Sequence, residues 1–595
     1  MAESLAISDY LRLSHIKTNV RQDRRLATSD LRPVHAVDTE TDQEGNILVI
    51  ADSESNFEDK ITPERLIKWL FSKRYQGSWN FFYNITFDAE VILKTLGDRL
   101  EIYKKTRRLR FKFGNYHIEY IPSKKLAIKK GHHSSIFFDI AQYYKESLID
   151  AYQSNIEKLD SEYLEFKSKR SSFSRNFYSH NPIKIRNYCI QDCKCAKELA
   201  EHWIKLFHLA FDFYPQRWIS SGYLAEKVIL NNKLPIPEFD SIPYEIQEIA
   251  WNCYDGGRFE ILKRGYIGTA FLYDINSAYP YAFSIIPDFT RGKWKKGKSI
   301  YQNARLGFFK IEADIPDTKY IPPFPFRSNR KLIFPSGKFQ TYCTLAELQS
   351  CENPNYYNIV ESWQFCTDEI SYPYKEFVDR IYSKRQKLKQ EGNPLELPLK
   401  VILNSIYGKT AQRVNARIGN LFSPIIASTI TGFVRAMLYD FVVKNGLESN
   451  VVSFATDSII TTKELQIDSP DLGSFKMEKS ANDVYVLQNG IYRFNGKWKK
   501  RGIGKLGEKT IEHLDTIVKD GNLYQVFKVL RTGRLRTSIL SDSISEIGKF
   551  KTVERLVNLN ADRKRMWFEQ LKDINDGKMI DSTPISMNHF RKDEV

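Results

Sequence analysis

Residues 267–283 read IGTAFLYDINSAYPYAF, and this stretch decides the predicted fold. A strand-like apolar run ends in Asp274, and a turn carrying Ser277 and Tyr279 follows it. A strand that ends in a carboxylate can present that carboxylate and a nearby carbonyl, that of Ile275, to a divalent cation. A lone stretch of this kind is more often a plain strand end, so its partners elsewhere in the chain decide its meaning.

A second acid lies further along the chain, in SFATDSII (453–460). Two apolar runs flank Asp457, as expected for the tip of a β-hairpin. Asp274 and Asp457 could share two Mg²⁺ ions, which would clamp an incoming triphosphate and activate a primer 3′-hydroxyl. A turn without metal is the plainer reading of either acid alone.

Between these acids lies KVILNSIYG (400–408). Lys400, Asn404 and Tyr407 fall at i, i+4 and i+7, so one helical face carries all three. Lys400 can neutralise a triphosphate, Tyr407 can press on a nascent base pair, and Gly408 lets the backbone come close. An exposed lysine and a half-buried tyrosine on an ordinary helix would give the same pattern.

The N-terminal third carries another set of acids. Asp38 and Glu40 are two residues apart in a strand-like run, so both project from one face. Asp88 opens a helical pattern, and Asp192 follows Tyr188 at helical spacing. Four acids brought together repel unless divalent cations neutralise them, as two-metal phosphodiester hydrolysis requires. Tyr188 could align the attacking water.

Bulk properties agree with a nucleic-acid partner. The 595-residue chain has a net charge of +17, and a basic balance favours polyanions. The seven cysteines form neither a disulfide framework nor a zinc-ligand pattern, and we interpret them as packing residues. The N-terminus lacks the apolar region of a signal peptide, and no run is long enough to span a membrane. We therefore expect a soluble protein in the cytoplasm or another intracellular compartment.

In order along the chain, these motifs resemble those of family B DNA polymerases, from about residue 34 to 505. The exonuclease motifs of that family match Asp38-Thr39-Glu40, Asn84 to Asp88 and Tyr188 to Asp192. Polymerase motif A resembles Asp274 to Pro280, motif B resembles Lys400 to Gly408, and motif C resembles Thr456-Asp457-Ser458. Six motifs in order are unlikely by chance.

The resemblance implies an α/β and α+β multidomain fold, with an RNase H-like exonuclease domain followed by a right-hand polymerase of palm, fingers and thumb. The predicted divisions are a basic N-terminal extension (1–33), the 3′–5′ exonuclease domain (34–205), a linker with a Y-x-G-G motif (206–265), palm (266–284), an insertion (285–375), fingers (376–415), palm (416–505) and thumb (506–595). The charged, Ser-rich segment 155–185 is interpreted as a connection rather than core.

Further features resemble the protein-primed branch found in viruses and linear plasmids. Tyr254-Asp255-Gly256-Gly257 is similar to the branch's template-contacting motif, which balances synthesis against editing. Ser147-Leu148 is similar to its single-stranded DNA motif, and residues 285–375 occupy the place of its first terminal-protein region.

The same resemblance implies residue roles. Tyr279 would be the steric gate against ribonucleotides, and Arg385 and Lys384 on a basic helix would contact triphosphate. Each polymerase or exonuclease site would hold two Mg²⁺ ions, which Mn²⁺ can replace. DNA contacts are implied for Asn84, Phe87, Ser147, Leu148, Tyr254, Gly256, Gly257, Thr456, Lys499, Lys500 and Arg501.

The chain departs from the family pattern in three places. Motif C has Ala455 where an acid is usual, and motif A has Ala278 where a larger apolar residue is common. The gap from Gly408 to Asp457 is too short for a second terminal-protein-region hairpin, so we expect weak strand displacement.

Several readings stay open. The first is a DNA polymerase with proofreading exonuclease, acting as a monomer on primer-template DNA and dNTPs, with a terminal protein as a further possible partner. A primer-independent primase-polymerase is an alternative, because Lys499-Lys500-Arg501-Gly502 resembles a motif of such enzymes. A DNA-binding nuclease with a decayed polymerase site is a third, supported by Ala455 alone.

Overall fold

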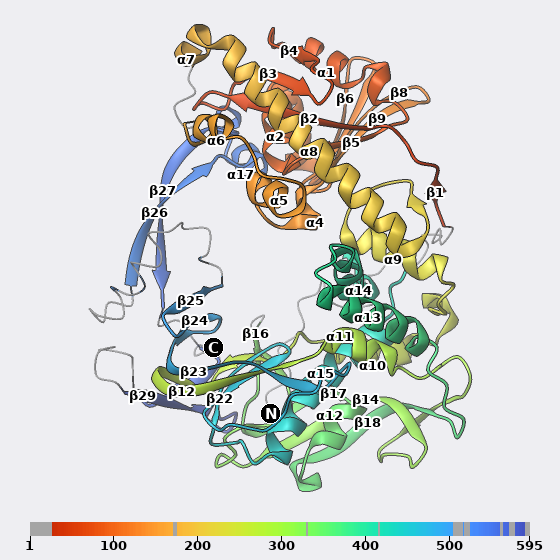
Figure 1. Ribbon diagram of the computed structural model, residues 1–595. Helices are drawn as coiled ribbons and strands as arrows, with labels where there is room; N and C mark the ends of the chain where they lie inside the picture. Colours follow the sequence, from red (N-terminus) through yellow and green to blue (C-terminus); the bar gives the residue numbers. More distant parts are fainter. Residues whose placement is uncertain are drawn as a thin grey trace.

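The structure is a computed structural model that describes residues 26–169, 175–328, 331–414, 417–501, 524–559, 563–569 and 578–589, with the single residues 503, 514 and 516. The rest of the predicted N-terminal extension lies outside the described residues. Two large sheets form the two ends of the molecule, with helices on one side between them and a long hairpin on the other (Figure 1).

The N-terminal domain is built on an eight-stranded mixed sheet. Its inner strands run parallel, whereas the outer strands pair antiparallel. In spatial order the strands are β4 (Phe57–Glu58), β3 (Ile47–Asp52), β2 (Val34–Thr41), β5 (Trp79–Phe82), β9 (His133–Asp139), β8 (Lys125–Lys130), β7 (Tyr116–Ile121) and β6 (Leu109–Phe113).

Helices complete this domain. Helix α1 begins after the N-cap Thr62, whose side chain accepts from the Arg65 amide, with Pro63 at the first position. The helices are α1 (Pro63–Leu70), α2 (Ile85–Lys94), α3 (Ile102–Thr106), α4 (Ala141–Tyr144), α5 (Leu148–Asn155), α6 (Ser161–Ser168), α7 (Arg175–His180) and α8 (Pro182–Phe211). The α/β class predicted for this region is confirmed.

A nine-stranded sheet forms the other end of the molecule. Its central strand β12 (Lys263–Ile275) pairs with β22, β23 and β29 along its length. The other strands are β11 (Phe259–Ile261), β21 (Val451–Ala455), β22 (Ser458–Thr461), β23 (Phe475–Gln488), β24 (Ile491–Phe494), β25 (Lys497–Lys500), β28 (Arg565–Trp567) and β29 (Met579–Pro584). The helices α10 (Tyr244–Asn252), α11 (Ala278–Ser284) and α15 (Pro424–Lys444) accompany it.

The strands of this sheet cross two of the predicted domain boundaries. Strand β11 and the start of β12 lie in the range predicted as linker, and β28 and β29 lie in the range predicted as thumb. The C-terminal strands return to the sheet because β29 pairs antiparallel with Lys263–Gly265. The short alternation of MIDSTP (579–584) carries little of the apolar signal that marks a sheet strand.

The inserted module (residues 285–375) has its own sheet and core. Its strands in spatial order are β13 (Lys293–Gly297), β18 (Tyr357–Cys366), β14 (Ala304–Ile315) and β17 (Gly337–Thr344). The helix α12 (Leu345–Ser350) follows, and the short strands β15 (Phe326–Ser328) and β16 (Lys331–Ile333) pair with each other. The module packs against α15 and α10, beside the large sheet.

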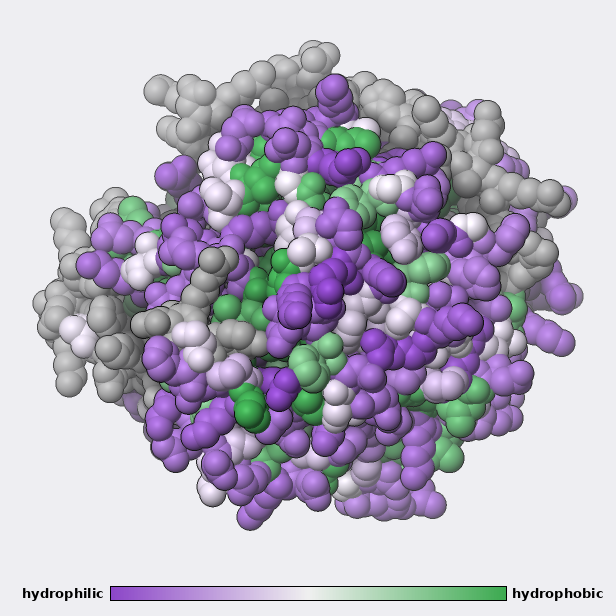
Figure 2. Space-filling model, turned by 90° about the horizontal axis from the view of Figure 1, so that it is seen from above, coloured by the Kyte–Doolittle hydropathy of each residue, from purple (hydrophilic) through white to green (hydrophobic). Residues whose placement is uncertain are grey.

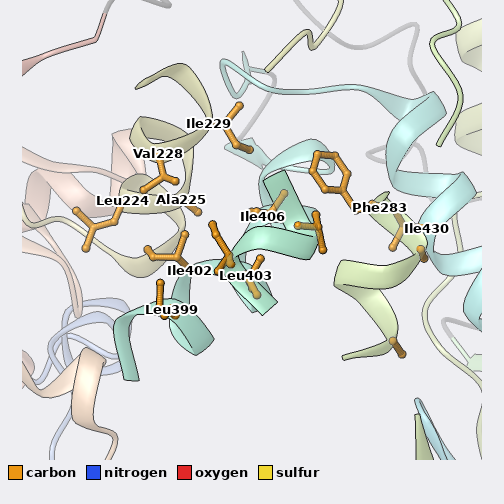
Figure 3. Packing of buried hydrophobic residues seen from close by; sticks show 14 of the residues in the cluster. Leu224, Ala225, Val228, Ile229, Phe283, Leu399, Ile402, Leu403, Ile406 and Ile430 are labelled. Carbon is orange, nitrogen blue, oxygen red and sulfur yellow. The ribbon is translucent and has the colours of Figure 1, made fainter. Parts of the chain in front are cut away.

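Two helices between the sheets carry the predicted fingers: α13 (Lys375–Gln390) and α14 (Glu396–Thr410). Leu399, Ile402, Leu403 and Ile406 recur at helical spacing on α14 and are buried against α9 (Ser221–Asn231) (Figure 3). Each such side chain contributes about 1.5–3 kcal/mol when fully buried. This packing turns the opposite face of α14, with Lys400, Asn404 and Gly408, toward solvent.

The C-terminal hairpin consists of β26 (Tyr524–Thr532) and β27 (Phe550–Asn558), with α17 (Leu535–Leu540) at its tip. Its base packs on the large sheet through Phe527 and Val557. Its tip enters the core of the N-terminal domain, where Leu535, Ile539 and Ile547 are fully buried. The hairpin therefore joins the two ends of the molecule, opposite the helices (Figure 1).

Backbone contacts reinforce this junction. The Leu535 amide donates to the carboxylate of Glu90, which is 6% exposed, at 3.1 Å. The Phe550 amide donates to the Gln43 carbonyl at 2.9 Å. At Gly45 a Cβ would lie 2.5 Å from the backbone of Gly548, so two glycines allow the chains to meet closely.

The prediction that no run is long enough to span a membrane was wrong by length and composition, because α15 meets both criteria, alone among the helices of the described residues. Of its most apolar window, 78% is buried inside the protein, as in the core helix of a globular domain. The face seen in Figure 2 is mainly hydrophilic, with apolar side chains in small separate groups.

Candidate active sites

The first carboxylate site consists of Asp38, Glu40, Asp88 and Asp192. Asp38 and Glu40 project from β2, Asp88 from the first turn of α2, and Asp192 from α8. Burial, followed by the charges of Asp88, Asp192 and Glu40, raises the pKa of Asp38 well above its ordinary value. The structure thus brings together the four acids that the sequence singles out.

The acids are held in place by local hydrogen bonds. Asp88 accepts from the amide of Thr39 at 3.1 Å and from its hydroxyl at 2.7 Å, which fixes α2 against β2. Tyr188 donates to Asp192 at 3.2 Å, as its helical spacing predicts. Mutual repulsion between these carboxylates raises their proton affinity. A bound divalent cation would relieve that repulsion. Carboxylate oxygens suit Mg²⁺.

Segment 155–185 is not merely a connection, and this prediction was wrong. Helix α6 lies against the first site, and its Lys167 donates to Asp192 at 2.7 Å. Tyr163 from the same helix also donates to Asp192. The Lys167 ammonium lies over the ring of Tyr188, 5.4 Å from its centre. The first site therefore holds a partly buried cation, Lys167, that the sequence pattern does not reveal.

The cysteines of the described residues are free, and most are buried, in agreement with a packing role. Cys189 lies beside the acids of the first site. Its thiol donates to the Asp38 carbonyl at 3.5 Å, and its sulfur lies within 4.8 Å of ligand atoms of Asp38 and Glu40. Burial raises the pKa of this thiol, so it stays protonated.

The residues expected to bind single-stranded DNA lie around the first site. Asn84 is exposed at a positive φ of 66°, directly before α2. Phe87 packs on Phe550 of the C-terminal hairpin, with ring centres 6.0 Å apart. Ser147 caps α5 by accepting from the Asp150 amide, and Leu148 is buried beside it. Leu148 is therefore a packing residue in this structure, whereas Asn84 is available to a ligand.

The second carboxylate site consists of Asp274 and Asp457. Asp274 lies near the end of β12, and Asp457 occupies the turn between β21 and β22, which confirms the predicted hairpin. In the register of the sheet, Asp274 lies opposite Ser458, and the Ile275 amide donates to the Asp457 carbonyl at 3.0 Å. The two acids are therefore immediate neighbours across adjacent strands.

Electrostatics distinguish this site from an ordinary strand end. Burial, then the charges of Asp457 and Glu478, raise the pKa of Asp274 to about 7. Burial also raises the pKa of Asp457. Lys499 on β25 opposes both shifts, so this lysine, a predicted DNA contact, lies close to the acids. Glu478 was not singled out from the sequence; its proximity depends on the pairing of β12 with β23.

Motifs distant in sequence meet beside these acids. The rings of Tyr279 and Tyr407 stack with centres 4.5 Å apart, which joins the turn after Asp274 to α14. A Cβ added to Gly257 would lie 3.0 Å from the Tyr279 hydroxyl and 3.2 Å from the Thr456 Cα. The predicted motifs A, B and C and the Tyr254–Gly257 motif therefore meet beside Asp274 and Asp457.

The predicted triphosphate ligands lie on the two helices of the fingers. Lys400 and Asn404 are exposed on α14, one turn apart, with Gly408 one turn further. Arg385 donates to the Ser277 hydroxyl at 3.4 Å and pairs with Glu396 at 3.1 Å, so it reaches the turn after Asp274. Lys384 is exposed.

The remaining predicted DNA contacts surround the second site. Tyr254 stacks on Trp251 with ring centres 4.9 Å apart, and Gly256 is exposed. Lys500 is half-buried on β25, while Arg501 lies over the ring of Phe259 at 4.1 Å. Arg501 thereby lies against β11, at the residue that pairs with Ala455.

Replacing Gly257 by alanine is expected to lower the activity of the second site about tenfold or more. The new methyl group would collide with the Tyr279 hydroxyl and the Thr456 backbone, which a packed site cannot easily absorb. Gly256→Ala is the matched control, because nothing lies within 4 Å of a Cβ there. Equal activity of the two variants, measured under identical conditions, would contradict this prediction.

The metal-free protein is expected to lose stability as the pH rises from about 4 to 7. The folded-state pKa of Asp274 lies above its unfolded value, so the folded state binds more protons across that window. The loss continues as the pH passes through the folded-state pKa of about 7 and levels off about one pH unit above it. Melting temperatures at pH 5 and pH 8, with and without Mg²⁺, test this expectation. Asp274→Asn should flatten the slope, and Mg²⁺ should stabilise most at pH 8.

Comparison with known proteins places this chain in a family. Residues 74–423 match the family described as DNA polymerase type B, organellar and viral. A DNA polymerase of Acidianus bottle-shaped virus is 25% identical over 429 residues, which cover 65% of this chain and 63% of that protein. The Escherichia coli primer-independent DNA polymerase PolB is 25% identical over 237 residues, covering 35% and 27% of the two chains.

Solved structures show the same fold. The structure of Phi29 DNA polymerase with primer-template DNA and incoming nucleotide aligns with a TM-score of 0.62 at 15% identity. The alignment covers 89% of this chain and 100% of that one. The predicted multidomain fold, an α/β domain followed by a right-hand polymerase fold, is thereby confirmed. The chain belongs to the organellar and viral family of type B DNA polymerases.

Proposed function

We propose that the protein is a template-directed DNA polymerase that adds deoxynucleotides to a primer 3′-hydroxyl and also removes nucleotides from DNA 3′ ends. The observation that carries this proposal is the convergence of Asp274, Asp457, Tyr279, Tyr407 and Gly257 on one place. Family membership and the acids of the N-terminal domain support it.

At the polymerase site, Asp274, Asp457 and the Ile275 carbonyl would hold Mg²⁺, two ions per site, with Mn²⁺ as a substitute. The raised pKa of Asp274 fits this role, since bound cations relieve the repulsion between the two carboxylates. The metal ions would supply charge neutralisation of the triphosphate and activation of the 3′-hydroxyl. Lys400, Asn404 and Arg385 would bind the triphosphate, and Tyr279 would exclude a 2′-hydroxyl.

At the exonuclease site, Asp38, Glu40, Asp88 and Asp192 would hold the metal ions, and Tyr188 would orient the attacking water. Lys167 is a further candidate contact for the phosphate, because its ammonium already lies among these acids. The 3′–5′ direction of degradation rests on the family resemblance. Asn84, Phe87 and Ser147 would receive the single-stranded end.

A primer-dependence assay tests the proposal. Purified protein with template, dNTPs and Mg²⁺ is expected to extend a DNA primer and to degrade it when dNTPs are omitted. Product without any primer would favour the primer-independent alternative, which the similarity to the Escherichia coli enzyme supports. Degradation without extension in Mg²⁺ or Mn²⁺ would favour a nuclease whose polymerase site has decayed.

Strand displacement is expected to be weak. Between α14 and β21 the described residues form two paired strands of two residues each, followed by α15. Most side chains of α15 are buried in the core. No described segment there could form a second long hairpin around downstream DNA. Extension on a gapped template with a blocking strand should stall at that strand. Long displaced products without helper proteins would contradict this expectation.

We further propose an intracellular setting, in the host of a virus or mobile element, with the enzyme acting as a monomer. A terminal protein as primer is the partner that the 285–375 module would suit. Extension from a purified terminal protein in place of a DNA primer would test that partner directly.

A further inference from the structure

The loop Cys253–Gly257 is fastened to the inserted module on one side. The Cys253 thiol donates to the Cys343 carbonyl of β17 at 3.2 Å. The Asp255 carboxylate pairs with Arg327 of β15. Both partners belong to residues 285–375, so the module holds the loop before and within the Tyr254–Gly257 motif.

A buried ion pair adds a third attachment. Arg435 of α15 donates through Nη1 to the carbonyls of Asp255 and Gly256, at 2.9 Å each. Its Nε donates to Glu347 of α12 at 2.7 Å. Arg435 and Glu347 are each 2% exposed. The arginine therefore spans from the module to the backbone of the loop.

The geometry of this pair is fixed from both ends. Glu347 accepts from the amide and hydroxyl of Thr344, at 2.9 Å each, which orients its carboxylate. A Cβ at Gly432 would lie 2.4 Å from the Thr344 hydroxyl, so α12 and α15 approach closely one turn before Arg435. These contacts hold the Glu347 carboxylate in the orientation in which it accepts from Arg435.

The opposite side of the loop faces Tyr279, the predicted steric gate against ribonucleotides. Gly257 lies against the Tyr279 hydroxyl and the Thr456 backbone. The Thr456 amide donates to the Arg258 carbonyl at 2.8 Å, directly after the loop. A shift of the loop would therefore reach Tyr279 and the turn that carries Asp457.

A buried ion pair is weak evidence for stability, since well-packed apolar residues often serve as well. Here Arg435 donates two hydrogen bonds to carbonyls of one loop. A pair of apolar residues could not make these hydrogen bonds. We propose that Glu347 and Arg435 are positioning residues, through which the module fixes the Tyr254–Gly257 loop against the gate and sets the balance between extension and degradation. This inference rests on the proposed polymerase and exonuclease functions.

The test uses the full-length variants Glu347→Gln and Tyr439→Phe. Tyr439 lies one turn after Arg435 on α15 and donates to Glu352 of the same module at 2.6 Å rather than to a carbonyl of the loop. The measured quantity is the dNTP concentration at which primer extension overtakes degradation. Glu347→Gln should raise it about tenfold, because hydrogen bonds to charged groups are lost. Tyr439→Phe should leave it unchanged.

Degradation of single-stranded DNA and the melting temperature are measured in parallel. Glu347→Gln should degrade single strands within about twofold of the wild-type rate, since the first site lies in another domain. Equal behaviour of the two variants, or losses that simply follow the melting temperature, would overturn the inference. A wild-type protein that never extends primers would instead overturn the proposed function.

Arg327→Gln keeps the test decisive if Glu347→Gln fails to fold. The Arg327 side chain is 33% exposed, so its loss is easier to accommodate, yet it removes the partner of Asp255. The inference predicts a shift of the extension balance in the same direction. A folded Arg327→Gln protein with wild-type balance, alongside an unfolded Glu347→Gln protein, would overturn it.

Discussion

Asp457→Asn is expected to lower primer extension about 1,000-fold or more while leaving degradation of single-stranded DNA intact. Asp457 lies beside Asp274 in the register of the large sheet, and Ala455 removes the other acid usual in this motif. No second acid of the motif can replace Asp457 as a ligand. Parallel extension and degradation assays on one preparation measure both effects.

The mirror variant is Asp38→Ala, which should abolish degradation and spare extension. Asp38 belongs to β2 of the N-terminal sheet, and Asp457 to a different sheet at the other end of the molecule. Equal loss of both activities in either variant, with the melting temperature unchanged, would contradict two independent metal sites.

Leu535→Ala and Ile539→Ala are each expected to lower the free energy of unfolding by about 2–5 kcal/mol. Both side chains are fully buried in the core of the N-terminal domain, although they come from the C-terminal hairpin. Truncation leaves a cavity there and loosens the hairpin tip. Urea denaturation followed by tryptophan fluorescence measures the change.

Leu540→Ala is the control for this pair, because Leu540 ends the same helix and is 48% exposed. It should change stability by no more than about 0.5 kcal/mol. If the hairpin also retains DNA during synthesis, the buried variants should give shorter products per binding event. Destabilisation of all three variants to the same extent would argue against a specific anchor.

Much of both sites could be predicted from the sequence because each key residue sits in a local pattern. The two-residue spacing of Asp38 and Glu40 places both on one face of a strand, and the structure has them on β2. Asp457 between two apolar runs predicts a hairpin tip, which the structure contains.

Other residues were missed because their partners are distant in sequence. Lys167 lies in a charged segment without apolar periodicity, and its role depends on a contact with Asp192. Glu347 and Arg435 are 88 residues apart, and a single buried arginine in an apolar helix carries no local signal. The C-terminal strands were missed because β29 pairs with a strand more than 300 residues earlier.

The anchored hairpin also constrains the order in which the protein can finish folding. The hydrogen bond between Glu90 and Leu535 joins residues separated by 445 positions, and Ile547 completes the same core. During synthesis the N-terminal domain emerges first, but this part of its core stays open until Leu535 to Ile547 have also left the ribosome. A chain halted in translation before Leu535 would leave uncovered the apolar side chains of the N-terminal domain on which Leu535, Ile539 and Ile547 pack.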